Sequence, residues 1–283
     1  MPPLVIQDKT LMRQWTRAAR ARGERVGLIP TMGALHAGHL TLVELAAAHA
    51  DRLVVSIYVN PAQFDRAEDL AKYPRMLAAD VAALAGTKCD VVFAPSEMYL
   101  GGHATWVEVA GLTEHLCGAM RPGHFRGVAT VVSKLLNVVE PDVAVFGNKD
   151  YQQRRVLERM VRDLDMAIAV LPAPTVREAD GLAMSSRNLR LDADARVRAV
   201  AIPRALEAAH ASFQGGERLV GVLAGRVRAA LTAAGGRIDY VEIADDATLV
   251  PHSDSTLVTA PSVLAVAVFF GGIRLIDNQV LVP

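Results

Sequence analysis

The sequence predicts an α/β protein: a Rossmann-like, doubly wound parallel sheet followed by a smaller α+β domain at the C-terminus. In the first half of the chain, short apolar runs alternate with helical patterns, which is typical of βαβ units. Several of these runs lack polar alternation, as expected of strands that are buried on both faces. Near residue 190 the pattern changes to alanine- and arginine-rich helices followed by strands.

The elements of the first half follow one another in βαβα order. Apolar spacing predicts helices over residues 10–22, 38–50, 75–85, 127–139 and 152–162. Short apolar runs predict strands at residues 26–29, 52–59, 91–93 and 143–146. The polar stretch over residues 60–74 predicts a loop. Because parallel strands are joined by crossover helices, we expect helices on both faces of one sheet.

The second half predicts a separate small domain. Helices are expected over residues 193–212 and 217–234, and strands over 238–243, 263–270 and 273–276. Gly271 and Gly272 separate the last two strands, which is typical of a β-hairpin. We therefore place a catalytic domain at residues 1–185 and a lid domain at residues 186–283.

Composition limits the classes of function. The 283 residues are 52% hydrophobic and carry 30 basic and 30 acidic side chains, which fits a folded protein with no general attraction to nucleic acid or anionic membrane. Cys89 and Cys117 form no CxxC pair, and the N-terminus lacks the pattern of a signal peptide. The longest apolar run near the C-terminus, residues 263–270, is too short to span a bilayer. We expect a soluble cytoplasmic protein.

The segment over residues 30–39, PTMGALHAGH, is the strongest candidate for chemistry. A strand, a glycine-containing turn and a helix that begins with His36 and His39 would place backbone N–H groups and imidazole donors at one anion site. Two other interpretations remain open at this point. The histidines could lie at an ordinary helix start, or they could share a zinc ion, although no acidic third ligand is near in sequence.

Three further segments carry polar groups after expected strands or in a loop. Asn60 to Phe64 places Gln63 after the second buried strand, where open α/β sheets bind ligands. Phe146 to Gln153 offers Lys149 to phosphate and Asp150 to ribose hydroxyls. Met184 to Asn188 combines two hydroxyls with a guanidinium. Each alone is typical of a turn, a helix cap or a solvated loop, but together they predict ATP binding.

The ordered motifs resemble the pantothenate synthetase (pantoate–β-alanine ligase) family, a member of the HxGH nucleotidylyltransferase superfamily. The segments that carry the resemblance are PTMGALHAGH (30–39), VNPAQF (59–64), RPGHFRGVATVVSKL (121–135), FGNKDYQQ (146–153), ADGLAMSSRN (179–188), YVEI (240–243) and RLIDN (274–278). The resemblance covers essentially the whole chain. It implies an AMP-forming, Mg²⁺-dependent ligase that makes pantothenate from (R)-pantoate, β-alanine and ATP through a pantoyl adenylate. It also implies a homodimer.

The resemblance assigns roles to individual residues. His39 would be the proton donor, His36 would assist at the phosphates, and Lys149 and Arg187 would also be catalytic. Gln63 and Gln153 would hold pantoate, and Gln63 would also line the β-alanine site. ATP would contact Met32, Gly33, Ala34, Leu35, His36, Ala37, Gly38, His39, Gly147, Asn148, Lys149, Asp150, Val176, Met184, Ser185, Ser186 and Arg187. No metal ligand is assigned.

Three positions depart from the family pattern: Ala37, Asn148 and Arg154. None removes a proposed catalytic group. Two other functions are considered beside the ligase: a nucleotidylyltransferase with a dinucleotide-like product, and a nucleotide sensor without turnover. The glutamine pair favours a small hydroxy acid over a phosphorylated acceptor, and the presence of His39, Lys149 and Arg187 counts against a sensor.

Overall fold

The computed structural model describes residues 2–65 and 67–283 and shows two compact units. The N-terminal unit consists of the segment that ends at Val109, together with residues 121–148 and 153–174. The C-terminal unit consists of residues 110–120, 149–152 and 175–283. The boundaries of these units differ from the expected division after residue 185, which stays a prediction. Residues 1 and 66 of the expected first domain lie outside the described residues.

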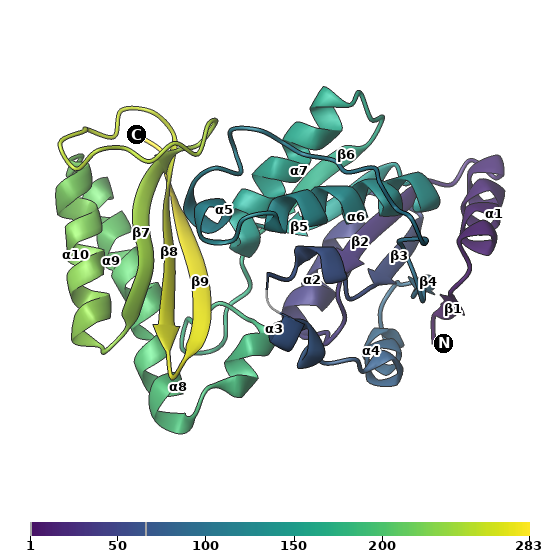
Figure 1. Cartoon of the computed structure of the whole chain (residues 1–283), viewed down its shortest axis with the longest axis horizontal. Coiled ribbons are helices and arrows are strands. Elements are labelled where there is room, and N and C mark those ends of the chain that lie inside the picture. The colour runs from purple at the N-terminus through teal and green to yellow at the C-terminus, as the bar shows by residue number, and fades with distance from the viewer. Residues whose placement is uncertain (1, 66) are drawn as a thin grey trace. The chain divides into compact units, whose positions relative to one another are not determined.

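The N-terminal unit is built on a parallel sheet. In the described part of the chain this sheet has six strands in the order β1-β4-β3-β2-β5-β6 (Figure 1). The strands are β1 (Leu4–Ile6), β2 (Val26–Thr31), β3 (Arg52–Ile57), β4 (Val91–Phe93), β5 (Val143–Gly147) and β6 (Ala169–Ala173). The order runs outward in both directions from β2, so the predicted doubly wound sheet is confirmed.

Two strands were not predicted from the sequence, and both lie at the edges of the sheet. β1 has three residues, which is too short for a periodic pattern. β6 contains Pro172, which cannot donate a backbone hydrogen bond and is tolerated in a strand mainly at a sheet edge. In both cases pairing with a neighbouring strand, rather than local sequence, defines the strand.

The helices of the N-terminal unit follow the predicted order. They are α1 (Lys9–Ala21), α2 (Ala37–Ala46), η1 (Pro61–Gln63), α3 (Ala67–Ala71), α4 (Leu77–Leu84), α6 (His124–Val139) and most of α7 (Tyr151–Asp163). η2 (Asn148–Asp150) precedes α7. The prediction of a loop over residues 60–74 is wrong in part, because η1 and α3 lie within it. Asn60 caps η1 and Pro61 opens it, which favours a short helical turn there.

Apolar side chains on the two faces of the sheet meet different helices. Ile29, Val55 and Val145 pack in one buried cluster with Val43 and Ala46 of α2. Neighbouring strand residues point to the opposite face, where α1 and α6 lie against β2 and against each other. The helices thus cover both faces of the sheet. The segments that connect strands to helices lie at the carboxyl ends of the strands.

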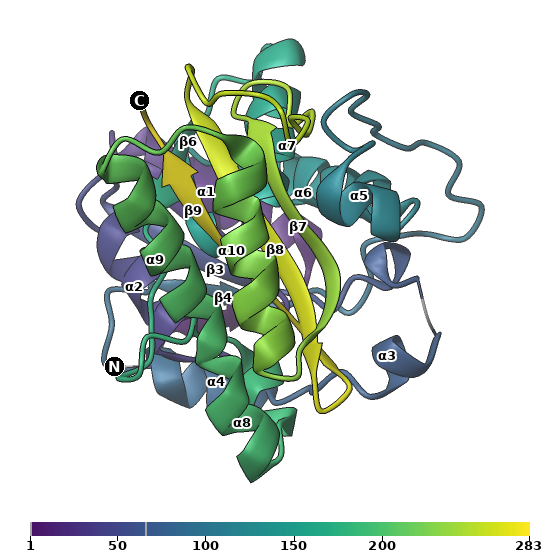
Figure 2. The same ribbon diagram turned by 90° about the vertical axis from the view of Figure 1, so that its left-hand side faces the viewer.

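The C-terminal unit contains an antiparallel sheet in the order β7-β8-β9 beside a helical layer (Figure 2). Its elements are α5 (Leu116–Met120), η3 (Ser186–Arg190), α8 (Ala193–Ala199), α9 (Ala201–Gln214), α10 (Val220–Ala233), β7 (Arg237–Asp245), β8 (Ser262–Phe270) and β9 (Ile273–Leu281). The predicted hairpin is confirmed. Gly271 and Gly272 have φ values of +53° and +76°, the left-handed conformations that a two-residue hairpin turn needs.

The predicted helix over residues 193–212 is wrong in one respect: it is two helices, α8 and α9, which meet at Val200. Pro203 lies in the first turn of α9, where its missing N–H needs no partner. In one continuous helix the carbonyl of Ala199 would lose its hydrogen bond and clash with the proline ring. No helix of the described chain is long and apolar enough to cross a membrane.

We expect the substitution Leu53→Ala to lower the free energy of unfolding of the N-terminal unit by about 2–5 kcal/mol, because it leaves a cavity in a packed core. Leu53 on β3 is 1% exposed. Trp15 and Trp106 both lie in the N-terminal unit, so urea unfolding followed by tryptophan fluorescence reports on it. The control is Leu100→Ala, since Leu100 is 71% exposed. Equal midpoints for the two variants would contradict the packing described here.

Candidate active site

The turn between β2 and α2 holds its backbone through one buried carboxylate. Asp80, in the first turn of α4, is 3% exposed. Its oxygens accept hydrogen bonds from the N–H groups of Ala34 (3.1 Å) and Leu35 (2.8 Å). The contact also explains why residue 33 is a glycine: its φ is +82°, and a Cβ at this position would lie 2.8 Å from Asp80 Oδ2. Asp80 was not among the residues predicted from the sequence, because it lies 45 residues beyond Leu35.

Asp80 also limits which groups of the turn can meet a ligand. The N–H of Gly33 donates to Thr31 Oγ1 (3.2 Å), so the three N–H groups from Gly33 to Leu35 all have partners within the protein. Helix geometry leaves the N–H groups of Ala37 and Gly38 without an intrahelical acceptor. The anion site expected here therefore depends on the first turn of α2 rather than on the turn before it.

The two histidines at the start of α2 lie together. Their ring centroids are 4.1 Å apart, and both side chains are partly exposed. His39 Nδ1 accepts a hydrogen bond from the backbone N–H of His36 (3.3 Å). A nitrogen that accepts carries no proton, so a neutral His39 has its proton on Nε2. The backbone of the helix start thereby makes Nε2 of His39 a hydrogen-bond donor.

Gln63 at the end of η1 lies against the turn that precedes His36. Its Nε2 donates to Met32 Sδ (3.0 Å), and its Oε1 accepts from Asn60 Nδ2 (2.9 Å). Asn60 is 1% exposed and donates also to the carbonyl of Gly127 (3.1 Å). The structure therefore brings together Met32 and Gln63, which were both predicted to contact substrates. It also shows that Asn60 orients the glutamine amide.

The start of α6 holds η1 in place. The carbonyl of Gln63 accepts from His124 Nδ1 (2.8 Å) and from Arg121 Nη2 (3.1 Å). Arg121 also donates to Asp65 (2.9 Å). Burial would raise the pKa of Asp65, but the hydrogen bond and charge of Arg121 outweigh it and hold that pKa below its ordinary value. The segment over residues 121–135 carried the resemblance, and the structure now shows what its first residues contact.

The two neighbouring glutamines at the start of α7 have different surroundings. Gln152 is 6% exposed; its amide bonds the backbone of Leu112, His115 and Cys117 at 2.7–2.9 Å. Gln153 is partly exposed and belongs to the N-terminal unit. Because the amide of Gln152 holds the segment around α5, Gln153 is the member of the pair with an accessible side chain.

The N-terminal unit thus gathers several predicted residues at one edge of its sheet. His36 and His39 follow β2, Gln63 follows β3, and Gly147, Asn148 and Gln153 lie at or beyond the end of β5. β3, β2 and β5 are neighbours and run parallel. The carboxyl ends of adjacent parallel strands are where open sheets bind ligands.

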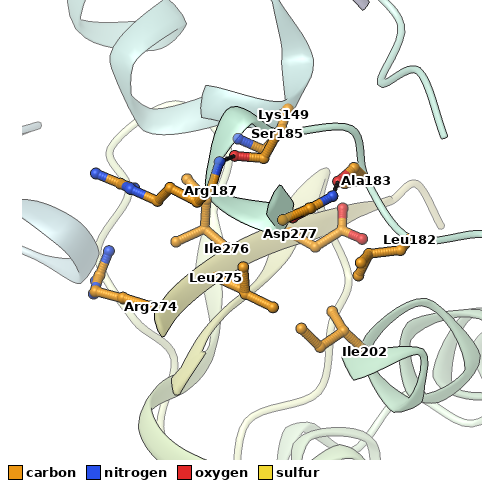
Figure 3. A pocket seen from close by; sticks show the side chains of 11 residues that line it. Lys149, Leu182, Ala183, Ser185, Arg187, Ile202, Arg274, Leu275, Ile276 and Asp277 are labelled. Atoms are coloured by element: carbon orange, nitrogen blue, oxygen red, sulfur yellow. Dashed lines mark hydrogen bonds between the residues drawn. The ribbon is translucent and has the colours of Figure 1, made fainter. Parts of the chain in front are cut away.

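A pocket within the C-terminal unit brings together predicted residues that are far apart in sequence (Figure 3). Lys149, Ser185 and Arg187 line it, and the opposite wall comes from β9. Lys149 Nζ lies 4.0 Å from a carboxylate oxygen of Asp150, whose side chain is half exposed. Ser185 Oγ accepts from the N–H of Arg187 (3.2 Å), so the serine caps η3. The two cations and the hydroxyl suit an anionic ligand.

The loop before η3 is a narrow hairpin. The N–H of Met184 donates to the carbonyl of Val176 (2.9 Å), and Arg177 pairs with Ala183 in an antiparallel bridge. Val176 and Met184, both predicted to meet ATP, are therefore neighbours. Ser186 and Arg187 follow in η3 with partly exposed side chains.

The departures from the family pattern have local explanations in part. Arg154 is 8% exposed and donates to the carboxylate of Glu158 one turn later on α7, so the buried cation is paired. Ala37 is exposed at the first position of α2.

Over residues 2–65 and 67–283, no three histidine, cysteine or acidic side chains lie close enough together to hold a metal ion. A zinc site built on His36 and His39 would need such a third ligand.

Comparison with known sequences places the chain in one family. The family model described as pantoate-beta-alanine ligase matches residues 4–280. A pantothenate synthetase of Moorella thermoacetica is 50% identical over 280 residues, which are 98% of each chain. A pantoate–beta-alanine ligase of Oryza sativa subsp. japonica is 47% identical over 303 residues, covering 98% of this chain and 96% of that protein.

Comparison with solved structures agrees with the sequence comparison. A pantothenate synthetase from Thermus thermophilus matches with a TM-score of 0.89 and 46% identity, over 99% of this chain and 100% of that one. A pantoate-beta-alanine ligase from Francisella tularensis, solved in complex with beta-gamma ATP and beta-alanine, matches with a TM-score of 0.78 and 28% identity. That match covers 98% of this chain and 97% of the other.

The contact between Asp80 and the turn predicts a local effect of the substitution Asp80→Asn. An amide has one acceptor oxygen, so one of the N–H groups of Ala34 and Leu35 loses its partner, at a cost of about 1–3 kcal/mol in the free energy of unfolding. Amide hydrogen exchange at these two residues should accelerate more than in the rest of β2 and α2. The control is Asp69→Asn on the exposed face of α3. Unchanged exchange at Ala34 and Leu35 would contradict the contact.

Proposed function

The chain belongs to the pantoate–β-alanine ligase family, and on this premise we propose how its residues carry out the family's reaction. The enzyme joins (R)-pantoate to β-alanine and converts ATP to AMP and pyrophosphate. The observation that carries the proposal is the β2–α2 turn, where one helix start holds two histidines beside Gln63 and Met32. The ATP and β-alanine named for the Francisella tularensis complex support the same substrates here.

The first step is formation of the acyl adenylate. A carboxylate oxygen of pantoate attacks the α-phosphorus of ATP, and the bond from that phosphorus to the bridging oxygen of pyrophosphate breaks. Negative charge grows on the phosphate oxygens. His39 supports this charge through its Nε2 proton, which the hydrogen bond at Nδ1 keeps in place. The start of α2 adds the partial positive charge of its backbone.

Lys149 and Arg187 supply fixed charge in the same step. Both line the pocket of the C-terminal unit, where Ser185 caps the turn that carries Arg187. We propose that this pocket receives the phosphates of ATP, with Asp150 on the ribose and Val176 and Met184 near the adenine. The family resemblance also assigns His36, Ala37 and Gly38, at the start of α2, to ATP. Cations that are held before the reaction lower its barrier, because they need no reorganisation.

The second step forms the amide. The amine of β-alanine attacks the acyl carbon of the adenylate, the acyl carbon–oxygen bond breaks, and AMP leaves with that oxygen while the amine loses a proton. We propose that Gln63 and Gln153 hold the hydroxyls and carboxyl of pantoate, and that Gln63 also faces β-alanine. Asn60 accounts for the direction of Gln63, since the opposite orientation of the glutamine amide would lose the hydrogen bond between them. A fixed acceptor and donor would position the acyl carbon for attack.

We propose Mg²⁺ as the companion of ATP, because Mg²⁺ commonly binds to phosphates, water and one or two carboxylates rather than to a protein cage. Over residues 2–65 and 67–283 no three metal-ligating side chains gather, so the ion would take most of its ligands from the phosphates of ATP and from water. When bound, the ion neutralises charge on the phosphate oxygens.

We also propose that the enzyme is a homodimer and works in the cytoplasm. Only the family resemblance supports the dimer, and sedimentation equilibrium tests it. Cys89 and Cys117 are both free thiols in the structure, which is compatible with a reducing compartment.

The reaction predicts the fate of one oxygen atom. With pantoate labelled with ¹⁸O in its carboxylate, one labelled oxygen should appear in AMP for each pantothenate formed, as measured by mass spectrometry. Steady AMP formation should need both pantoate and β-alanine. Unlabelled AMP, release of ADP, or a dinucleotide-like product would contradict the adenylate route.

The role of His39 predicts a large kinetic effect. The substitution His39→Ala removes a donor to the growing charge and should lower kcat by about 100- to 1,000-fold. His39→Gln, which can place an amide N–H near the position of Nε2, should retain more activity than His39→Ala. The control is His49→Ala, since His49 is exposed beyond the end of α2. Near-normal turnover of His39→Ala would exclude the assigned role.

The role of Lys149, which belongs to the C-terminal unit, also predicts a large kinetic effect. Lys149→Ala should lower kcat/KM for ATP by about 100-fold or more, while its melting temperature stays close to that of the wild type. Steady-state kinetics and thermal unfolding measure the two quantities. Lys88→Ala, which alters an exposed lysine, is the matched control. A variant that lost stability and activity in proportion would point to a structural lysine instead.

A further inference from the structure

Two adjacent residues on β9 have no role in the proposed reaction: Asp277, which lines the pocket of the C-terminal unit, and Asn278, the next residue along the strand. They end the segment RLIDN, which carries the family resemblance. Both are polar and both are buried, with 2% and 8% of their surface exposed. Burying a carboxylate and an amide costs free energy unless each has partners, so their contacts indicate what they do.

Asn278 contacts the backbone of Lys149. Its Nδ2 donates to the carbonyl oxygen of Lys149 over 3.0 Å. β9 is a strand of the small sheet, with Asn278 opposite Ala265 of β8. The amide therefore connects a rigid strand to the short helical turn that carries the lysine. Because the contact is to the backbone, it fixes the Cα of Lys149 and leaves its ammonium group to the pocket.

Asp277 contacts the other segment of the pocket. Its oxygens accept from Arg177 Nη1 (2.6 Å) and Nη2 (3.2 Å), and the N–H of Asn278 donates to Oδ1 (2.8 Å). Arg177 donates also to the carbonyl of Gly181 (3.1 Å) across its own hairpin. Burial would lower the pKa of Arg177, but the hydrogen bond and charge of Asp277 outweigh it and raise that pKa. The guanidinium of Arg177 thus keeps its charge beside Asp277.

The hairpin that Asp277 holds ends in the residues that face the pocket. Arg177 pairs with Ala183, and Val176 with Met184, directly before Ser185 and Arg187. Successive residues of a strand point to opposite faces. Two successive residues of β9 therefore reach different segments: Asn278 contacts the turn of Lys149, and Asp277 contacts, through Arg177, the hairpin before Arg187.

We propose that Asn278 is a positioning residue for Lys149, and that Asp277, through Arg177, positions the loop of Arg187 against it. β9 is then a common support that sets the spacing of the two cations at the phosphates. The proposal rests on the role proposed above for Lys149. It predicts that loss of the Asn278 amide misplaces the lysine without removing it.

The test is a double-mutant cycle on the full-length enzyme. Asn278→Val removes the donor and keeps a residue that favours strands. It should lower kcat/KM for ATP by about 10- to 100-fold, since a small misplacement of a catalytic group has effects of this size. The KM for β-alanine should stay within about twofold of the wild-type value. In a Lys149→Ala background, the same substitution should cost less than about twofold, because the residue it positions is gone.

The matched control is Gln279→Ala. Gln279 is the next residue on β9, and its amide donates within the same strand to the carbonyl of Val280, so its loss should leave kcat/KM for ATP unchanged. Wild-type kinetics of Asn278→Val would overturn the proposal. So would a full loss in the Lys149→Ala background, since the two residues would then act independently.

Two further outcomes are decided by the same set of variants. If Asn278→Val and Asn278→Ala both fail to unfold cooperatively, Asn278 is needed for folding and the positioning role is overturned. If Lys149→Ala alone has wild-type kinetics, the role proposed for Lys149 fails, and this result is independent of any variant at Asn278.

Discussion

The buried carboxylate of Asp80 is the contact on which the geometry of the histidine site depends. A turn between a buried strand and a helix must satisfy its backbone N–H groups, and here the carboxylate accepts two of them. This fixes the path of the chain into α2. The start of α2 then sets the donor on His39, because the N–H of His36 occupies Nδ1. A single acidic side chain on α4 thereby determines where a neutral histidine presents its proton.

The same principle, a polar side chain bound to a backbone group, recurs at several of the functional residues. Arg121 and His124 hold the backbone of Gln63, and Asn278 holds the backbone of Lys149. Most of these supporting residues lie on a different element from the residue they support. Catalysis by preorganised charge requires this arrangement, since side chains on loops keep their positions only if their backbone is fixed.

The two units contribute different parts of the proposed chemistry. The N-terminal unit carries the histidines and the glutamines at the carboxyl edge of its sheet, and the C-terminal unit carries the lysine and arginine around its own pocket. The pantoyl adenylate formed in the first step is a reactive anhydride, so water must be excluded from it until the amine of β-alanine arrives.

The sequence by itself determined the parallel sheet, the hairpin at Gly271 and Gly272, and the family, because strand and helix periods and long ordered motifs are local properties. It also supplied the residues of the proposed site. Tertiary structure alone decided the edge strands β1 and β6, whereas the break at Val200 has a local cause in Pro203. Tertiary structure alone also brought Asp80 to Leu35 and Asn278 to Lys149. Such contacts join residues that are 45 and 129 positions apart, and no periodic pattern encodes which distant backbone group a polar side chain will meet.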